Sequence, residues 1–163
     1  MGLGTKWAFL LLGIGIIVMV SSGCRSGHAL NVLNATQDDA TKHYSLGVEL
    51  QKKGDLDGAT AEYRTALRLN PNYAVAHTGL GVALYDKGDL DGAITEYRTT
   101  IRLNPNHAKA HYNLGLALMD QGNVSAAAKE LEEFIRLAPN TPSNRQKIDE
   151  AKKRLNKLSV PEK

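Results

Sequence analysis

The chain has 163 residues and carries 20 Lys and Arg against 17 Asp and Glu, so its formal net charge is +3. This length suffices for one modest domain with appendages. The longest basic cluster, Lys152 to Arg154, is too short for a nucleic-acid footprint, which needs a dense stripe of Lys and Arg. Aromatic residues make up 6% of the chain and do not interleave with basic ones, which excludes stacking on bases. We therefore expect no nucleic-acid partner.

The first 23 residues have the three-part pattern of a secretory signal segment. Lys6 supplies a positive charge, residues 7–20 contain no charged residue, and small residues follow at 21–23. The apolar stretch falls within the range of about 7–15 residues that is typical of signal peptides. A membrane-spanning helix needs about 17–25 residues, a length that residues 7–23 just reach. We expect a signal peptide over residues 1–23, and an uncleaved transmembrane anchor is the alternative.

The only cysteine of the chain, Cys24, directly follows this segment and has no partner for an internal disulfide. The stretch Ser21-Ser22-Gly23-Cys24 resembles the lipobox of bacterial lipoproteins, although that motif usually has Leu where Ser21 stands. The resemblance implies that the Cys24 thiol receives a diacylglyceryl group and that the chain is cleaved before Cys24. Cleavage by ordinary signal peptidase, which would give a plain secreted protein, stays open.

The lipobox resemblance also implies a location. A lipid on Cys24 would place the protein at the bacterial cell envelope, lipid-anchored and facing the periplasm. Arg25 stands where Asp would favour retention at the inner membrane, so the outer membrane is favoured. An inner-membrane protein anchored by its N-terminal helix is the alternative.

Residues 24–39 lack sustained periodicity and mix Gly, Ser, Asn and Asp. Such a composition is typical of linkers. We expect a flexible tether there, or a short partial helix near residues 30–33.

A period of 34 residues dominates the rest of the chain. The segment KGDLDGATAEYRTALRLNPN, which begins at Lys53, returns at Lys87 as KGDLDGAITEYRTTIRLNPN, and a weaker copy begins at Gln121. The copies share the columns Leu46/Leu80/Leu114, Gly47/Gly81/Gly115, Ala59/Ala93/Ala127, Tyr63/Tyr97/Leu131 and Pro71/Pro105/Pro139.

These columns predict a pair of helices in each copy. Apolar residues from Ala59 to Leu67 recur at i, i+4, i+7 and i+8, the spacing of one helical face. Gly54 fits the left-handed cap that ends the first helix, and Asp55 fits the N-cap of the second. Pro71 ends the second helix because proline lacks the backbone N–H and disfavours a helical residue before it.

A helix pair with these columns at this period resembles the tetratricopeptide repeat. The match covers residues 40–141 as three units, 40–73, 74–107 and 108–141. The resemblance implies an all-α fold, a right-handed helical-hairpin solenoid. Residues 142–163 add a terminal helix over residues 146–158 and a tail, with Ser143 and Gln146 as a capping box. We expect this helix to cover the last open face of the stack with one apolar side, formed by Ile148, Ala151, Leu155 and Leu158.

The sequence contains no catalytic constellation, phosphate-binding loop or nucleophile elbow, so we expect a non-enzymatic protein without cofactor or small-molecule substrate. His43, His77 and His111 recur at the repeat period, where the family usually has a large aromatic residue. Equivalent positions on stacked helices lie about 8–10 Å apart, whereas zinc ligands lie about 2 Å from one ion. We expect these rings to pack and not to share a metal. A metal-binding or enzymatic accessory protein is the remaining alternative.

The family resemblance places the partner-binding surface in a concave groove that the first helices of the units line. There we expect a peptide or helix of an envelope partner to bind, as on a scaffold or adaptor. Part of this surface could instead pack against the terminal helix or the tether. Of the positions that form the family's carboxylate clamp for heat-shock chaperone tails, only Lys109 agrees, so a chaperone co-adaptor is not expected. The groove positions are Thr41, Tyr44, Ser45, Val48, Gln51, Lys52, Val75, Thr78, Val82, Tyr85, Asp86, Lys109, Tyr112, Asn113, Leu116, Met119 and Asp120.

Overall fold

The computed structural model describes residues 26–159, of which only the backbone is described at 26–35, 143 and 158–159. Over this range the chain is entirely helical apart from short connections: α1 (Ser26–Lys52), α2 (Leu56–Leu69), α3 (Ala74–Asp86), α4 (Leu90–Leu103), α5 (Ala108–Asp120), α6 (Val124–Leu137) and α7 (Pro142–Ser159). The signal segment and Cys24 lie outside the described residues. None of the described helices has the length and hydropathy to cross a bilayer.

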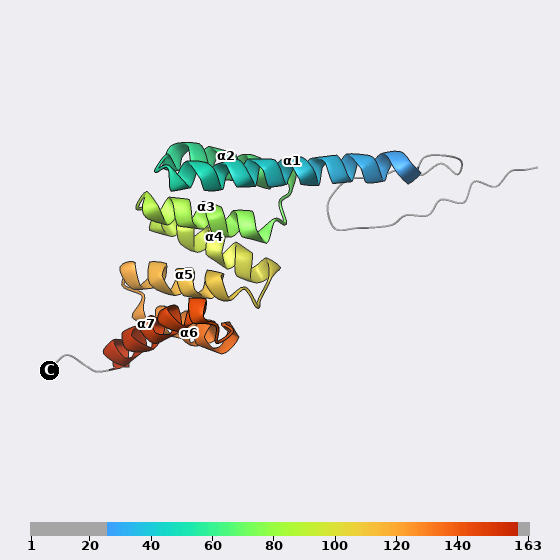
Figure 1. The fold of residues 1–163 in the computed structure, drawn as a ribbon. Helices are drawn as coiled ribbons and strands as arrows, with labels where there is room; N and C mark the ends of the chain where they lie inside the picture. The colour runs from blue at the N-terminus through green and yellow to red at the C-terminus, as the bar shows by residue number, and fades with distance from the viewer. Residues whose placement is uncertain (1–25, 160–163) are drawn as a thin grey trace, which may run out of the picture.

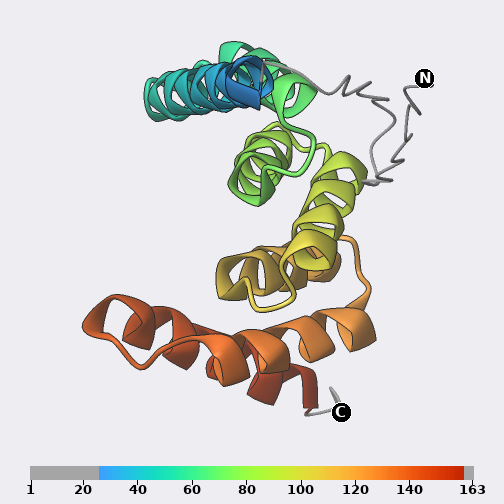
Figure 2. The same ribbon diagram turned by 90° about the vertical axis from the view of Figure 1, so that its right-hand side faces the viewer.

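The helices form three antiparallel pairs that stack one below another (Figure 1). The most extensive contacts join α1 to α2, α3 to α4 and α5 to α6, and smaller ones join each pair to the next. The view turned by 90° shows the same succession, with α7 after the third pair (Figure 2). The expected all-α helical-hairpin solenoid is confirmed.

The three hairpin turns share one chemistry. Each contains a glycine at positive φ, between 82° and 84°, which suits glycine because it has no Cβ. The next residue caps the second helix: its side chain accepts a hydrogen bond from a backbone N–H three residues on, at 2.9 Å for Asp55 and Asp89 and 3.4 Å for Asn123. The predicted turns are therefore confirmed.

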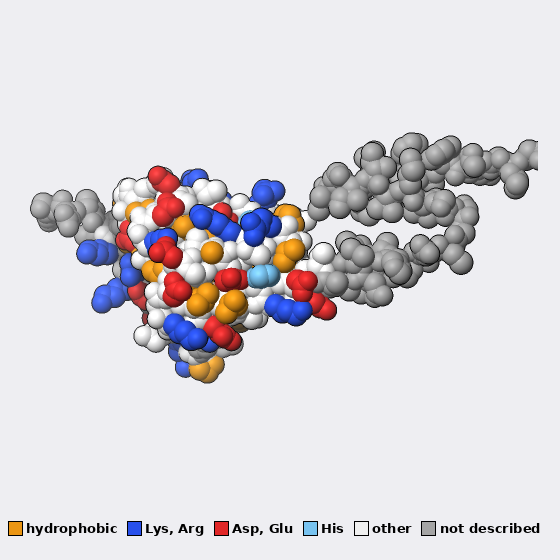
Figure 3. All heavy atoms as spheres, turned by 90° about the horizontal axis from the view of Figure 1, so that it is seen from above, with side chains coloured by type: hydrophobic (Ala, Val, Ile, Leu, Met, Phe, Trp, Pro, Cys, Tyr) orange, Lys and Arg blue, Asp and Glu red, His pale blue; other side chains and the backbone are white. Residues whose placement is uncertain are grey.

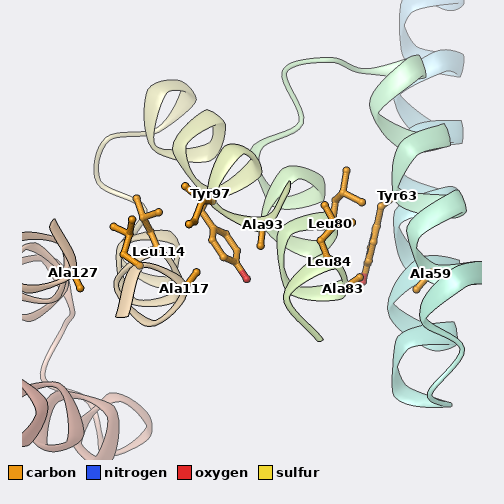
Figure 4. Close-up of a cluster of buried hydrophobic side chains, with 12 residues drawn as sticks. Ala59, Tyr63, Leu80, Ala83, Leu84, Ala93, Tyr97, Leu114, Ala117 and Ala127 are labelled. Atoms are coloured by element: carbon orange, nitrogen blue, oxygen red, sulfur yellow. The ribbon is translucent and has the colours of Figure 1, made fainter. Parts of the chain in front are cut away.

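The core follows the stack as a continuous row of side chains (Figure 4). Tyr63 of α2 and Tyr97 of α4 are among its largest fully buried members. A Cβ added at Gly47 would lie 2.7 Å from the Tyr63 ring, and one at Gly81 would lie 2.6 Å from the Tyr97 ring. The glycine column therefore makes room for a large side chain that the second helix inserts against the first, a tyrosine ring in units 1 and 2 and Leu131 in unit 3.

The flexible tether predicted for residues 24–39 is wrong from Ser26 onward, because α1 runs unbroken from Ser26 to Lys52. No proline interrupts this stretch, and Gly27 stands in the first turn, where a glycine costs little. The C-terminal half of α1 packs on α2, and a helix extends easily once a packed turn has nucleated it. As a result, α1 projects far beyond the end of α2 (Figure 1).

The terminal helix α7 continues the 34-residue register of the repeats. Ala151 is fully buried, like Ala83 and Ala117 at the equivalent positions of α3 and α5. The helix begins at Pro142, one turn earlier than predicted, and the N–H of Asn144 donates to Thr141 Oγ1 at 3.3 Å. Thr141, and not Ser143, therefore starts the helix, with proline in the first helical position that it favours. α7 is in effect the first helix of a fourth unit.

Charged residues on α7 occupy the positions where a further second helix would pack. In the first three units this face carries a glycine, such as Gly115, and a leucine that packs in the core, such as Leu118. α7 has Asp149 and Lys152 at these positions. Because an unpaired buried charge is costly, this face disfavours another helix, and the predicted capping role of α7 is explained.

The opposite end of the stack is closed in a similar manner. Lys42 and Glu49 of α1 occupy positions that are fully buried alanines in α3 and α5. Leu46 is 43% exposed, whereas its equivalent Leu80 is 3% exposed, so no described helix covers this face. Seen from this end, acidic, basic and apolar side chains are interspersed, with no extended patch of one charge (Figure 3).

Candidate functional site

A hollow of about 520 Å³ lies across α1, α3 and the start of α5. These are the first helices of the three units, as the family resemblance implies. We call this hollow the groove, and its lining residues are Tyr44, Val48, Gln51, Lys52, Tyr63, Val75, Thr78, Gly79, Val82, Asp86, His107 and Lys109.

The structure brings together only part of the surface predicted from sequence. The predicted residues that line the groove are Tyr44, Val48, Gln51, Lys52, Val75, Thr78, Val82, Asp86 and Lys109. Those that lie outside it are Thr41, Ser45, Tyr85, Tyr112, Asn113, Leu116, Met119 and Asp120. Sequence reasoning missed three lining residues, Tyr63, Gly79 and His107.

Gly79 opens the floor of the groove. A Cβ at this position would lie 2.9 Å from the Tyr63 ring, so any larger residue would displace the ring. One repeat later the equivalent position holds Asn113, and the groove does not extend over it. Its Nδ2 is buried and has no hydrogen-bond partner among the described residues. The difference between Gly79 and Asn113 at equivalent positions of units 2 and 3 was the signal in the sequence for the location of the hollow.

A chain of hydrogen bonds joins the floor to the rim. The Tyr63 hydroxyl donates to Gln51 Oε1 at 2.9 Å, and Gln51 Nε2 donates to Asp86 Oδ2 at 3.2 Å. Burial, with a smaller effect of Tyr44, raises the pKa of Tyr63 to about 12. Tyr63 therefore stays a neutral donor, and the amide of Gln51 is held in one orientation between units 1 and 2.

Aromatic rings form one wall of the groove. Tyr44 lies 5.8 Å from Tyr63 and 5.5 Å from Tyr73, measured between ring centroids, and both pairs are tilted. Such contacts add about 0.5–1.5 kcal/mol to the burial of the rings. Burial, and to a lesser extent Tyr73, raises the pKa of Tyr44. Tyr44 and Tyr63 line the groove, and Tyr73 packs on Tyr44 without lining it.

The end of the groove at α5 carries an uncharged histidine cap and a free lysine. His107 is the N-cap of α5, and its Nδ1 accepts a hydrogen bond from the Ala110 N–H at 3.2 Å. Burial, with the nearby charge of Lys109, lowers the pKa of His107, which keeps Nδ1 able to accept. Within the described residues, neither Lys109 nor Lys52 has a hydrogen-bond or ion-pair partner. The groove therefore offers two free cations.

In unit 3, α7 covers part of the surface that was predicted to bind. Tyr112 is only 7% exposed; its ring lies 4.9 Å from Phe134, and its hydroxyl donates to Glu150 Oε2 of α7 at 3.1 Å. Leu116 and Met119 pack against the same apolar cluster, which includes Ala151. The alternative that part of the predicted surface packs against the terminal helix holds for this unit.

Two further predicted residues connect neighbouring units. The Tyr85 hydroxyl of α3 donates to Asp120 of α5. This hydrogen bond, followed by burial, raises the pKa of Tyr85 to about 12. Tyr85 and Asp120 therefore hold units 2 and 3 in register and are not a free binding surface.

The histidines at the repeat period do not simply fill an aromatic column. The Nδ1 atoms of His43 and His77 lie 2.6 Å from the carboxylates of Glu62 and Glu96, and His111 lies 2.7 Å from a third glutamate, Glu130. A glutamate 19 residues after each histidine was the signal in the sequence. The described residues contain no group of three or more His, Cys, Asp or Glu that could hold a metal ion.

Comparisons with known proteins agree with this geometry. A family model described as TPR repeat matches residues 47–88 and 81–122, and one described as tetratricopeptide repeat matches residues 108–141. Together these matches span more than half of the chain. No curated protein matches it significantly.

Solved structures with low sequence identity share the fold. The first TPR of Spaghetti (RPAP3), bound to the HSP90 peptide SRMEEVD, has a TM-score of 0.66 and 21% identity over 74% of this chain and 95% of that one. The Yersinia enterocolitica type III secretion chaperone SycD, in complex with a peptide of the translocator YopD, has a TM-score of 0.71 and 19% identity over 74% and 92%. The TPR2B domain of yeast Sti1, in a complex with pHsp70, has a TM-score of 0.68 and 20% identity over 73% and 97%.

Proposed function

The chain belongs to the tetratricopeptide-repeat family, and from this premise we propose that it is a non-enzymatic interaction module whose groove binds an extended segment of a protein partner. The observation that supports this most is the groove itself, which is open over units 1 and 2 because Gly79 lacks a side chain. The peptide complexes of RPAP3 and SycD show that proteins of this fold bind peptides. We infer an envelope protein as the partner from the lipobox resemblance of residues 21–24.

The lining suggests the chemistry of the bound segment. Val48, Val75 and Val82 supply branched apolar surface, and the rings beside them are held in place. Two lysines without ion-pair partners supply positive charge to the groove. Lys109 lies in the first turn of α5, and Lys52 is the last residue of α1. A segment with small apolar side chains and an acidic group fits this lining.

A matched pair of valine substitutions tests the groove. Val75 in the groove is 38% exposed, and Val124 outside it is 43% exposed; both stand in the first turn of a helix, where glutamate is tolerated. A peptide selected on the full chain from a displayed random library should bind Val75→Glu about tenfold or more weakly, by fluorescence titration. Val124→Glu should bind it like the unsubstituted protein. Equal affinities of both variants and the parent would show that the groove is not the binding site.

The N-terminal segment supports a location at a membrane. The proposed module is lipid-anchored at Cys24 after removal of residues 1–23, at the outer membrane and facing the periplasm. An uncleaved helix in the inner membrane is the alternative. Intact mass and fractionation of the protein and of Cys24→Ala distinguish them. A lipidated mass that the substitution abolishes supports the lipid anchor, whereas an unmodified full-length mass in the membrane fraction supports the helix.

A further inference from the structure

The junction between units 1 and 2 contains a histidine with a hydrogen-bond acceptor at each ring nitrogen. His77 Nδ1 lies 2.6 Å from Glu96 Oε2 in α4, and its Nε2 lies 3.0 Å from the backbone oxygen of Pro71. An ionised carboxylate and a carbonyl oxygen can only accept hydrogen bonds. Both contacts are satisfied together only when the ring carries a proton on each nitrogen. We call His77 with these two acceptors the His77 joint.

The His77 joint connects three parts of the stack. His77 belongs to α3 and Glu96 to α4, the two helices of unit 2, whereas Pro71 lies in the 70–73 loop that ends unit 1. The same loop is tied to α1 by a hydrogen bond from Asn70 Nδ2 to Gln37 Oε1 at 2.7 Å. It also carries Tyr73, whose ring contacts Tyr44 in the wall of the groove. The position of the loop therefore affects the groove.

Unit 1 provides a natural comparison within the chain. His43 has the same contact with a glutamate, but it lies inside the long helix α1, and no proline carbonyl faces its Nε2 in the described residues. Its side chain is 38% exposed, whereas that of His77 is 14% exposed. His111 repeats the full arrangement at the next junction, with Nε2 3.0 Å from the Pro105 oxygen. The three-way connection is thus a property of the junctions between units.

We propose that the His77 joint makes the coupling between units 1 and 2 depend on pH: the 70–73 loop is held against unit 2 while both ring nitrogens are protonated, and is released when one proton is lost. After that loss, one nitrogen lone pair faces a carboxylate or carbonyl lone pair, and that contact becomes repulsive. The proposal does not rest on the groove having a partner, because its effect can be read from the protein alone.

The groups that face the ring favour its protonated form. Burial, the largest single influence, lowers the pKa of His77. The hydrogen bonds to Glu96 and to the Pro71 carbonyl, with the charge of Glu96, outweigh burial and the opposing charge of Arg102, so the pKa of His77 is raised overall. Because the pKa of His77 is higher in the folded state, the stabilising contribution is complete below about pH 6.5 and is lost as the pH rises through the folded pKa.

Hydrogen exchange of the full chain, followed from about pH 5 to about pH 9, tests the proposal. After correction for intrinsic rates, opening of residues 70–78 relative to the buried residues 59–63 of α2 should increase about three- to tenfold as the pH rises, the scale of one modest hydrogen bond. In His77→Gln the loop should be open at every pH, without a step. The control His43→Gln should keep the step, because its ring contacts no loop. The absence of a step in the parent protein, or its persistence in His77→Gln, would overturn the proposal.

A second variant keeps the test informative if His77→Gln does not fold. Glu96→Gln preserves the size of the partner but removes its charge, so the step in exchange and the titration midpoint of the His77 ring, measured by NMR, should both move to lower pH. If the ring midpoint moves and the step does not, the loop is not controlled by His77. If neither moves, Glu96 does not hold the proton, and the joint as proposed is wrong.

Discussion

Units 1 and 2 supply nearly all of the lining of the groove, whereas unit 3 supplies only Lys109, although all three units have the same repeat pattern. Gly79 packs closely on the buried Tyr63 ring at the first junction, and Asn113 stands at the equivalent position of the second. In unit 3, α7 packs over Tyr112, Leu116 and Met119. The repeat pattern determines the stack, and individual residues outside the shared columns determine which part of the stack is accessible.

The largest expected effect comes from removing α7 from unit 3. Ala151→Glu places a charge at a fully buried position and should cost about 2–3 kcal/mol of docking free energy. Hydrogen exchange should show loss of protection in residues 142–159 and exposure around Tyr112, while α1 to α4 keep theirs. The adjacent, exposed Lys152→Glu is the control and should leave the exchange pattern unchanged. If Ala151→Glu exchanges like the parent, the covering of unit 3 does not depend on this contact.

A smaller effect is expected from exchanging the residues that distinguish the two junctions. Gly79→Asn should reduce affinity for the selected peptide about tenfold and cost about 1–2 kcal/mol of unfolding free energy, because its Cβ would meet the Tyr63 ring. Asn113→Gly removes a buried amide without a partner and should change stability by less than about 1 kcal/mol. Titration with peptide and urea unfolding measure both. Unchanged affinity of Gly79→Asn would mean that the open floor is not used in binding.

The smallest expected effect concerns the hydrogen bond between the Tyr112 hydroxyl and Glu150 of α7. Tyr112→Phe keeps the ring contact with Phe134 but removes the bond to Glu150, and should cost about 1 kcal/mol in urea unfolding. Tyr44→Phe is the comparison and should cost less, because the Tyr44 hydroxyl makes no hydrogen bond within the described residues. A larger loss of unfolding free energy for Tyr44→Phe than for Tyr112→Phe would show that the hydrogen bond to Glu150 does not stabilise the docking of α7.

Sequence predicted the stack well because its determinants are local and recur. Gly54 with positive φ, the Asp55 cap and Pro71 act within a few residues of themselves, and the period of 34 repeats them. The apolar face of α7 was also predicted, and Ile148, Ala151 and Leu155 do pack on unit 3.

The remainder depends on contacts between distant parts of the chain. The coverage of Tyr112 by α7 requires knowing how the last helix docks, which periodicity alone does not state. The helical stretch before residue 40 has weak patterning, and its continuation follows from the packed half of α1 rather than from its own residues. The pairing of His77 with Glu96 was visible as a spacing of 19 residues, but only a hairpin brings the two side chains together.

The unbroken course of α1 has a mechanical consequence. A helix of 27 residues is about 40 Å long and resists bending far more than a linker of the same composition would. Its C-terminal half also supplies Tyr44, Val48 and Gln51 to the groove. A tilt or pull applied at Ser26 is therefore transmitted along one rod directly into a wall of the groove, whereas a flexible connection would absorb it.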